Sequence, residues 1–137
     1  MGPLIVSLLL AVLLVISPAQ ALDTSAGVGL QDRALFQEKV DYTLTNQTGG
    51  DFHDQNLANT SFAGAVGRNA NFRGANLHGA ILTQGAFAEA DFRGADLSDA
   101  LMDRADFVGT DLRDAVLIGI IASGSSFTNA RIDGADF

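Results

Sequence analysis

A chain of 137 residues with 47% hydrophobic and 18% charged side chains is long enough for one folded domain and too short for two sizeable cores. Its 16 acidic residues against 8 basic ones give a net charge of −8, which disfavours nucleic acid and anionic lipid as partners, because the basic residues do not cluster. Cysteine is absent, which excludes disulfides, thiolate catalysis and cysteine-ligated metal sites.

The first 21 residues have the pattern of an export signal. Residues 4–16 are apolar except for Ser7, and Ala19-Gln20-Ala21 supplies the small residues of a signal-peptidase site. The basic residues that usually precede such a stretch are missing. We expect a signal peptide over residues 1–21; the alternative is an uncleaved anchor, because a membrane span needs about 20 apolar residues.

Residues 22–50 precede the regular part of the chain, and we expect them to form an N-terminal cap and linker. Their apolar side chains could cover the first layer of the regular part, where Gly67 leaves space. These side chains are Leu35, Phe36, Val40, Tyr42 and Leu44.

From Asp51 to Phe137, a large apolar residue recurs at every fifth position, which we number i, and only Gly67 and Ala122 break the series. Position i−2 is small in almost every repeat. A period of five fits neither a helix nor a strand and indicates an internal repeat. The predicted core residues are Phe52, Leu57, Phe62, Phe72, Leu77, Leu82, Phe87, Phe92, Leu97, Met102, Phe107, Leu112, Leu117, Phe127 and Ile132.

The repeat predicts an all-β square coil in which each pentapeptide forms one side and four sides make a turn of the solenoid. Positions i and i−2 point inward, because a narrow solenoid has room for one bulky side chain per side. Glycine or a short polar residue at i+2 suits the corner. Residues 51–137 would make a little over four coils, a rod of roughly 20 Å. Since the chain stops in mid-pattern at Phe137, we expect its C-terminal cap to be missing.

The repeat resembles the pentapeptide-repeat family, and three stretches carry the resemblance: Ala75-Asn76-Leu77-His78-Gly79, Ala95-Asp96-Leu97-Ser98-Asp99 and Ala105-Asp106-Phe107-Val108-Gly109. It implies a right-handed quadrilateral parallel β-helix. Within the family, the chain is most similar to lumenal proteins of cyanobacteria and chloroplast thylakoids, through its export segment, residues 42–48 and residues 100–106.

Residues 20 apart should stack on one outer side of the coil. One such row is Arg73, Arg93 and Arg113, and beside it runs a second row of Asn71, Asp91 and Asp111. Alternating charge favours a neutralised salt-bridge ribbon over an anion-binding row of arginines.

A second side carries apolar residues where the repeat normally has polar ones. Ile81, Leu101 and Ile121 form a column, with Val116 and Ile118 near the same corner. Such a stripe indicates a surface for docking a partner protein. The alternative is that the N-terminal arm or a missing C-terminal cap covers it.

Chemistry-bearing residues are scattered around the coil, so we expect no enzyme activity, cofactor or metal. Asp96, Asp99, Asp103 and Asp106 fall on different sides, and the only histidines, His53 and His78, lie on different faces. An enzyme or a sugar-binding β-helix would need outward aromatic platforms or clustered carboxylates, whereas the chain has no Trp and one Tyr.

The expected function is therefore a non-catalytic, exported structural scaffold of the thylakoid lumen or periplasm. It would bind another protein through its regular surface and meet a membrane only through the signal segment. The alternative is an acidic DNA mimic of the pentapeptide-repeat type that acts on DNA gyrase. The charge of −8 suits this alternative, but the export segment and the short rod, against about 34 Å for one DNA turn, oppose it.

Overall fold

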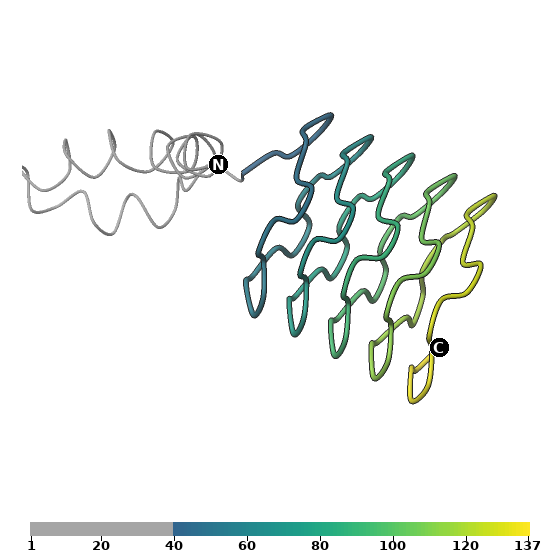
Figure 1. Ribbon diagram of the computed structural model, residues 1–137. Helices are drawn as coiled ribbons and strands as arrows, with labels where there is room; N and C mark the ends of the chain where they lie inside the picture. The colour runs from purple at the N-terminus through teal and green to yellow at the C-terminus, as the bar shows by residue number, and fades with distance from the viewer. Residues whose placement is uncertain (1–39) are drawn as a thin grey trace, which may run out of the picture. The chain divides into compact units, whose positions relative to one another are not determined.

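The computed structural model describes residues 40–137, of which Asp41–Phe137 form one compact unit. The predicted signal peptide, Leu35 and Phe36 lie outside the described residues. Figure 1 shows the unit as similar coils stacked side by side along the chain. No helix and no continuous strand occurs in residues 40–137; the coils are joined by isolated parallel β-bridges. Nothing in this part of the chain is a helix long and apolar enough to cross a membrane.

Adjacent coils are held in register by backbone hydrogen bonds between residues about 20 apart. Around Phe72, the N–H at position i−1 donates to the preceding coil, from Asn71 to the carbonyl of Gly50 at 2.8 Å. The N–H of Phe72 itself donates to the following coil, to the carbonyl of Asp91 at 2.7 Å. The bridges repeat this register, with Asn71 opposite Asp91 and Asp91 opposite Asp111. Every coil therefore presents the same positions to its neighbours.

A tight turn at position i+2 makes each corner. At the corner after Phe72, the N–H of Ala75 donates to the carbonyl of Phe72 at 3.0 Å, and Gly74 has a φ of +67°. All described i+2 residues have positive φ, between 56° and 74°. Glycine, asparagine and aspartate tolerate this left-handed conformation best, which explains their frequency at the corners and confirms the predicted corner positions.

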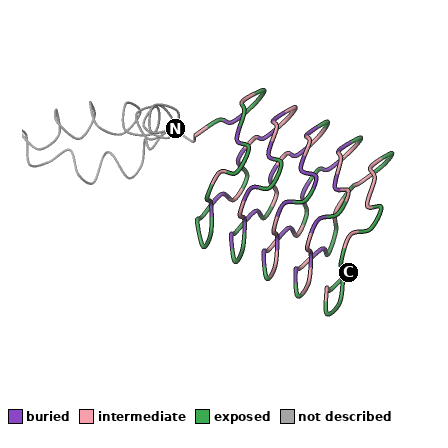
Figure 2. Cartoon of the chain, viewed as in Figure 1, coloured by how far each residue is buried: buried purple, intermediate pink, exposed green. Residues whose placement is uncertain are grey.

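Positions i and i−2 form the core, as Figure 2 shows by the buried colour on the inner side of each coil. Aromatic rings stack from coil to coil: Phe52, Phe72 and Phe92 lie 4.9 Å and 4.8 Å apart between successive ring centroids, with planes within 6° of parallel. Such aromatic pairs stabilise a core by about 0.5–1.5 kcal/mol beyond their buried area.

The predicted core is confirmed from Phe52 to Leu117, all of which are buried. The prediction is wrong for Ile132, which has the inward register but is 49% exposed, and Phe127 is only half-buried. No further coil of the described chain stacks on these two side chains. Their position in the repeat is as expected, and their burial is not.

The coil begins at Asp41, two pentapeptides before the boundary at Asp51 that the sequence pattern predicts. Tyr42 and Gln47 occupy centre positions and are buried, and Asn46 forms a bridge with Val66. The Tyr42 ring stacks on Phe62 at 4.7 Å. Residues 41–137 therefore make almost five coils, because Tyr42 belongs to the coil itself rather than to a separate cap.

Gly67 stands where the repeat calls for a large side chain, and the next coil fills the space. A Cβ atom on Gly67 would lie 2.7 Å from Cδ1 of Phe87. The Phe87 ring thus occupies the volume that the N-terminal arm was expected to cover.

Replacing a ring in the middle of the stack should destabilise the fold strongly. Phe72 is fully buried and packs against four other phenylalanine rings. We expect Phe72→Ala to lower the free energy of unfolding by about 3–5 kcal/mol, measured by denaturant unfolding. Ile132→Ala, at a half-exposed position of the same column, is the control and should cost about 1 kcal/mol or less. Equal losses in both variants would contradict the stacked core.

Candidate functional site

The structure stacks the predicted apolar residues in one column. Bridges join Ile81 to Leu101 and Leu101 to Ile121, so these three residues, here called the apolar column, lie one above another on one side of the coil. Leu101 is 36% exposed and Ile121 50%, whereas Ile81 is part-buried. The column therefore offers apolar surface that increases toward the C-terminal coils.

The two other residues of the predicted docking surface lie on the adjacent side. Val116 and Ile118 flank the buried Leu117, and the corner at Gly119 separates them from Ile121. Ile118 is 48% exposed and Val116 is part-buried. The structure thus places these residues around one corner of the last coils rather than in the column itself.

The residues of the apolar column occupy position i−1, which elsewhere has a structural role that the sequence analysis missed. In most repeats an Asn or Asp at i−1 accepts a hydrogen bond from the backbone N–H at i+1. Asn71 Oδ1 accepts from the N–H of Arg73 at 3.1 Å, and Asp106 Oδ1 accepts from the N–H of Val108 at 3.0 Å. This bond satisfies the one N–H per repeat that the coil itself leaves free. The recurrent Asn or Asp before each centre was the signal for it.

Isoleucine and leucine at i−1 cannot make this bond. Within residues 40–137, no acceptor lies within hydrogen-bond reach of the N–H of Thr83 or Asp103, which follow Ile81 and Leu101. One coil further on, the side chain of Asp103 takes over the role and accepts from the N–H of Ser123 at 3.0 Å. The apolar column therefore combines exposed apolar side chains with free backbone donors.

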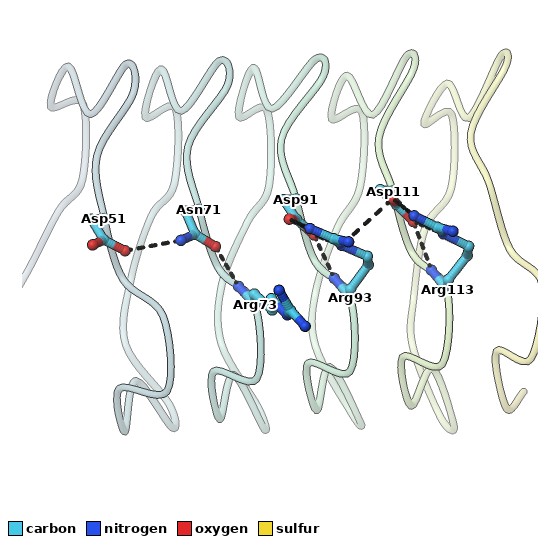
Figure 3. A network of polar contacts seen from close by, with 7 residues as sticks. All are labelled: Asp51, Asn71, Arg73, Asp91, Arg93, Asp111 and Arg113. Carbon is cyan, nitrogen blue, oxygen red and sulfur yellow. Dashed lines mark hydrogen bonds and ion pairs between the residues drawn. The ribbon is translucent and has the colours of Figure 1, made fainter.

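The side with the two charged rows, here called the Asp/Arg face, is an ion-pair network over two of its coils (Figure 3). Arg93 Nη2 lies 2.5 Å from Asp91 Oδ2, and its Nε lies 3.6 Å from Asp111 Oδ2 in the next coil. Arg113 Nη2 lies 2.6 Å from Asp111 Oδ2. The salt-bridge ribbon is confirmed for these two arginines.

Arg73 differs from the other arginines of the row. Its neighbour at i−1 is Asn71, which donates from Nδ2 to Asp51 Oδ1 at 3.1 Å and accepts only the backbone N–H of Arg73. Among the described residues, the Arg73 guanidinium has no carboxylate within 4 Å. The row therefore contains two paired arginines and one without a carboxylate partner.

The ion pairs hold the aspartates of the Asp/Arg face in their charged form. The hydrogen bonds from Arg93 lower the pKa of Asp91, and those from Arg113 lower the pKa of Asp111. These two carboxylates stabilise the folded state above about pH 4, and the contribution is lost as the pH falls through their lowered pKa values. Near neutral pH the ribbon is therefore fully ionised.

The histidines and the remaining aspartates do not come together. His53 Nδ1 pairs with Asp51 Oδ1 at 2.7 Å, whereas His78 Nδ1 lies 2.9 Å from Ser98 Oγ. Asp96 Oδ1 accepts from Ser98 within its own repeat. In residues 40–137, no three His, Asp or Glu side chains are placed to hold a metal ion.

Two family models match the coil. The model described as pentapeptide repeats in nine copies fits residues 68–111, and the model described as pentapeptide repeats in eight copies fits residues 51–84 and 105–137. Together they cover the chain from Asp51 to Phe137. The chain belongs to the pentapeptide-repeat family. Pentapeptide-repeat proteins fold as right-handed quadrilateral β-helices and generally serve as scaffolds, so the predicted fold class is confirmed for the coil.

Solved pentapeptide-repeat structures share this architecture. QnrB1, a plasmid-mediated fluoroquinolone resistance protein, is 18% identical with a TM-score of 0.70, and the match covers 75% of this chain and 50% of QnrB1. A pentapeptide repeat protein from Nostoc Pcc 7120 is 21% identical with a TM-score of 0.52, and the match covers 79% of this chain and 73% of that protein. At these identities the likeness shows the fold alone. This chain spans about half the length of QnrB1.

A pentapeptide repeat protein from the thylakoid lumen of Arabidopsis thaliana has a higher sequence identity of 35%. The match covers 70% of this chain and 67% of that protein, with a TM-score of 0.37. No curated protein matches the chain. The comparisons thus establish the family and the coil, and they do not identify a partner.

The first coil of the Asp/Arg face provides a test of its electrostatics. The hydrogen bond to Asp51 raises the pKa of His53, so the pair stabilises the folded state below about pH 6.5 and this contribution is lost as the pH rises through the raised pKa. We expect Asp51→Asn to bring the pKa of His53 down toward its ordinary value, measured by NMR titration of the imidazole protons. Asp99→Asn removes an equal charge elsewhere and should leave the pKa of His53 unchanged. An unaltered His53 titration in Asp51→Asn would contradict the pairing.

Proposed function

We propose that this protein is an exported, non-catalytic scaffold of the thylakoid lumen or periplasm that binds a partner protein through the apolar column and the adjacent corner. The observation that supports it is the replacement of the hydrogen-bonding Asn or Asp at i−1 by Ile81, Leu101 and Ile121. In each of these repeats the coil gives up a backbone-satisfying bond and exposes apolar surface instead. Both changes are unfavourable for an isolated coil in water.

The chemistry of the column indicates what the partner must offer. Leu101, Ile118 and Ile121 require apolar side chains on the partner, and the free N–H groups of Thr83 and Asp103 require carbonyl or carboxylate acceptors between them. A protein segment with apolar side chains and exposed backbone carbonyls provides both. The rigid register of the coil presents these groups without rearrangement, which reduces the entropy cost of binding.

Export is supported by the sequence of residues 1–21, with its apolar stretch and its Ala19-Gln20-Ala21 cleavage pattern. The coil itself has a surface suited to a compartment outside the cytoplasm as well as within it. The location is therefore a separate part of the proposal and is tested separately.

Restoring the ordinary repeat residue gives a sharp test of the apolar column. We expect the double variant Leu101→Asn and Ile121→Asn to bind the partner at least tenfold more weakly. Its free energy of unfolding should stay within about 1 kcal/mol of wild type, because each new side-chain hydrogen bond, worth about 0.5–1.5 kcal/mol, offsets lost apolar contact. Binding is measured by affinity capture from a lumenal or periplasmic fraction, followed by titration of the captured protein.

Val66→Asn is the matched control for this experiment. Val66 is also an apolar residue at i−1, but its column contains Asn46 and Ala86 and lies on another side of the coil. It should leave binding unchanged. Full affinity in the double variant, or an equal loss in the control, would count against the apolar column as the docking surface.

The location is tested by protease protection in intact and lysed membrane vesicles. We expect a protein shortened by residues 1–21 that resists protease until lysis, because a cleaved export signal places it inside the vesicle. The control is a cytoplasmic protein of the same cells in the same preparations. An uncleaved, cytoplasmic chain would overturn export and leave the gyrase-directed DNA mimic, which the charge of −8 favours, as the function to be tested.

A further inference from the structure

The Asp/Arg face contains an open hollow that the salt-bridge ribbon does not fill. Its volume is about 320 Å³, and its lining consists of Arg73, Arg93, Gly94, Arg113 and Asp114. Three of these five residues are arginines from three successive coils. A chain with twice as many acidic as basic residues thus gathers three guanidinium groups around one opening.

The hollow exists because two glycines follow one another in a corner column. A side chain at i+2 normally extends over the glycine at i+2 of the next coil: a Cβ atom on Gly74 would collide with Asp54 Oδ1, and one on Gly134 would collide with Asp114 Oδ1. Gly94 follows Gly74, which has no side chain to extend. A Cβ atom on Gly94 would meet nothing within 4 Å.

The same geometry decides where the nearby carboxylate points. Asp114 Oδ1 lies over Gly134, in the coil beyond the hollow, and therefore away from Gly94. The two aspartates of the ribbon, Asp91 and Asp111, already accept from Arg93 and Arg113. The carboxylates around the opening are thus either engaged in the ribbon or directed elsewhere.

The arginines retain donors for a further acceptor. Arg93 and Arg113 use Nε and Nη2 for the aspartates, which fixes each guanidinium plane and leaves Nη1 without a described partner. Arg73 has no described side-chain acceptor at all, and in Figure 3 it extends from its own coil toward that of Arg93. Arg73 is thus the unneutralised charge of the row.

We propose that Arg73, Arg93 and Arg113 form a binding site for a phosphate-type oxyanion in the hollow over Gly94. Arginine forks bind such oxygens through paired N–H donors, and a tetrahedral anion can accept from donors in several coils at once. Three arginines against the aspartates 91 and 111 leave a local positive charge. The open space over Gly94 admits either the free ion or the phosphate group of an ester.

This site lies on a different side of the coil from the apolar column, so it is independent of the proposed protein-docking function. The opposing charge of the whole chain and the exposed position both predict that binding weakens with rising salt. The paired arginines pre-organise the opening, and Arg73 supplies the charge that the ribbon does not neutralise.

The test is titration of the full chain with inorganic phosphate and with phosphoserine, followed by NMR of the arginine Nε–H signals. We expect saturable one-to-one binding that shifts the Nε–H signals of Arg73, Arg93 and Arg113. The two probes distinguish a free ion from a phosphate ester, and saturable binding of either supports the site. Acetate, a planar carboxylate, should bind at least tenfold more weakly.

Two variants examine the geometry and the charge separately. Gly94→Asn fills the hollow with a residue that tolerates positive φ, and Asn69 followed by Glu89 shows that consecutive coils accept side chains at this corner. It should abolish binding with the fold intact. Gly109→Asn makes the same change at a corner on another side of the coil and should have no effect.

Arg73→Gln should weaken phosphate binding at least tenfold, whereas Arg68→Gln, with the same loss of charge on another side, should change it less than twofold. The absence of saturable phosphate and phosphoserine binding would overturn the proposal. Losses in the two control variants as large as those in Gly94→Asn and Arg73→Gln would also overturn it, since they would indicate non-specific attraction.

Discussion

The backbone hydrogen bonds between coils are the interaction on which the rest of this structure depends. They pair each residue with one about 20 positions away, and they use the N–H groups at i−1, i and i+2 of each repeat. Because the register is fixed, every side chain stacks on the side chain of the same repeat position in the next coil. The core and the outer faces are therefore built from columns rather than from individual contacts.

Each column has a different tolerance for departures from the repeat. The centre column accepts Gly67 only because Phe87 supplies the missing volume from the next coil. The i−1 column accepts Ile81 and Leu101 at the cost of a hydrogen bond to the following N–H. The corner column accepts Gly94 after Gly74 at no cost in hydrogen bonds, and leaves a hollow. The two candidate binding regions are thus both places where a column departs from its ordinary pattern.

The sequence predicted the coil because a period of five is visible wherever the centres are large and apolar. Phe72 and Phe92 reveal both their burial and their neighbours in this way. Tyr42 and Gln47 did not, because a polar glutamine at a centre interrupts the pattern although its side chain is buried. The pattern gives the direction of Ile132 but not its exposure, since burial depends on whether another coil lies beyond it.

The candidate regions were predictable only in part. The apolar column follows from numbering alone, because residues 81, 101 and 121 are 20 apart. The pairing of Arg93 with Asp111 across coils follows from the same spacing, but the isolation of Arg73 depends on side-chain geometry. The hollow over Gly94 required the direction in which side chains at i+2 extend, and no property of the sequence alone gives that direction.

The four-sided coil also restricts how such a chain can change its length. Removing or adding a single pentapeptide would preserve the core, since any centre can follow any other, but it would rotate every later side by a quarter turn. The arginines after that point would then leave their row, and the aliphatic residues would leave theirs. Only insertions or deletions of a whole coil of 20 residues keep the outer surfaces aligned. Chain length and surface pattern are therefore coupled, and a change that is harmless to folding can still dismantle a binding face.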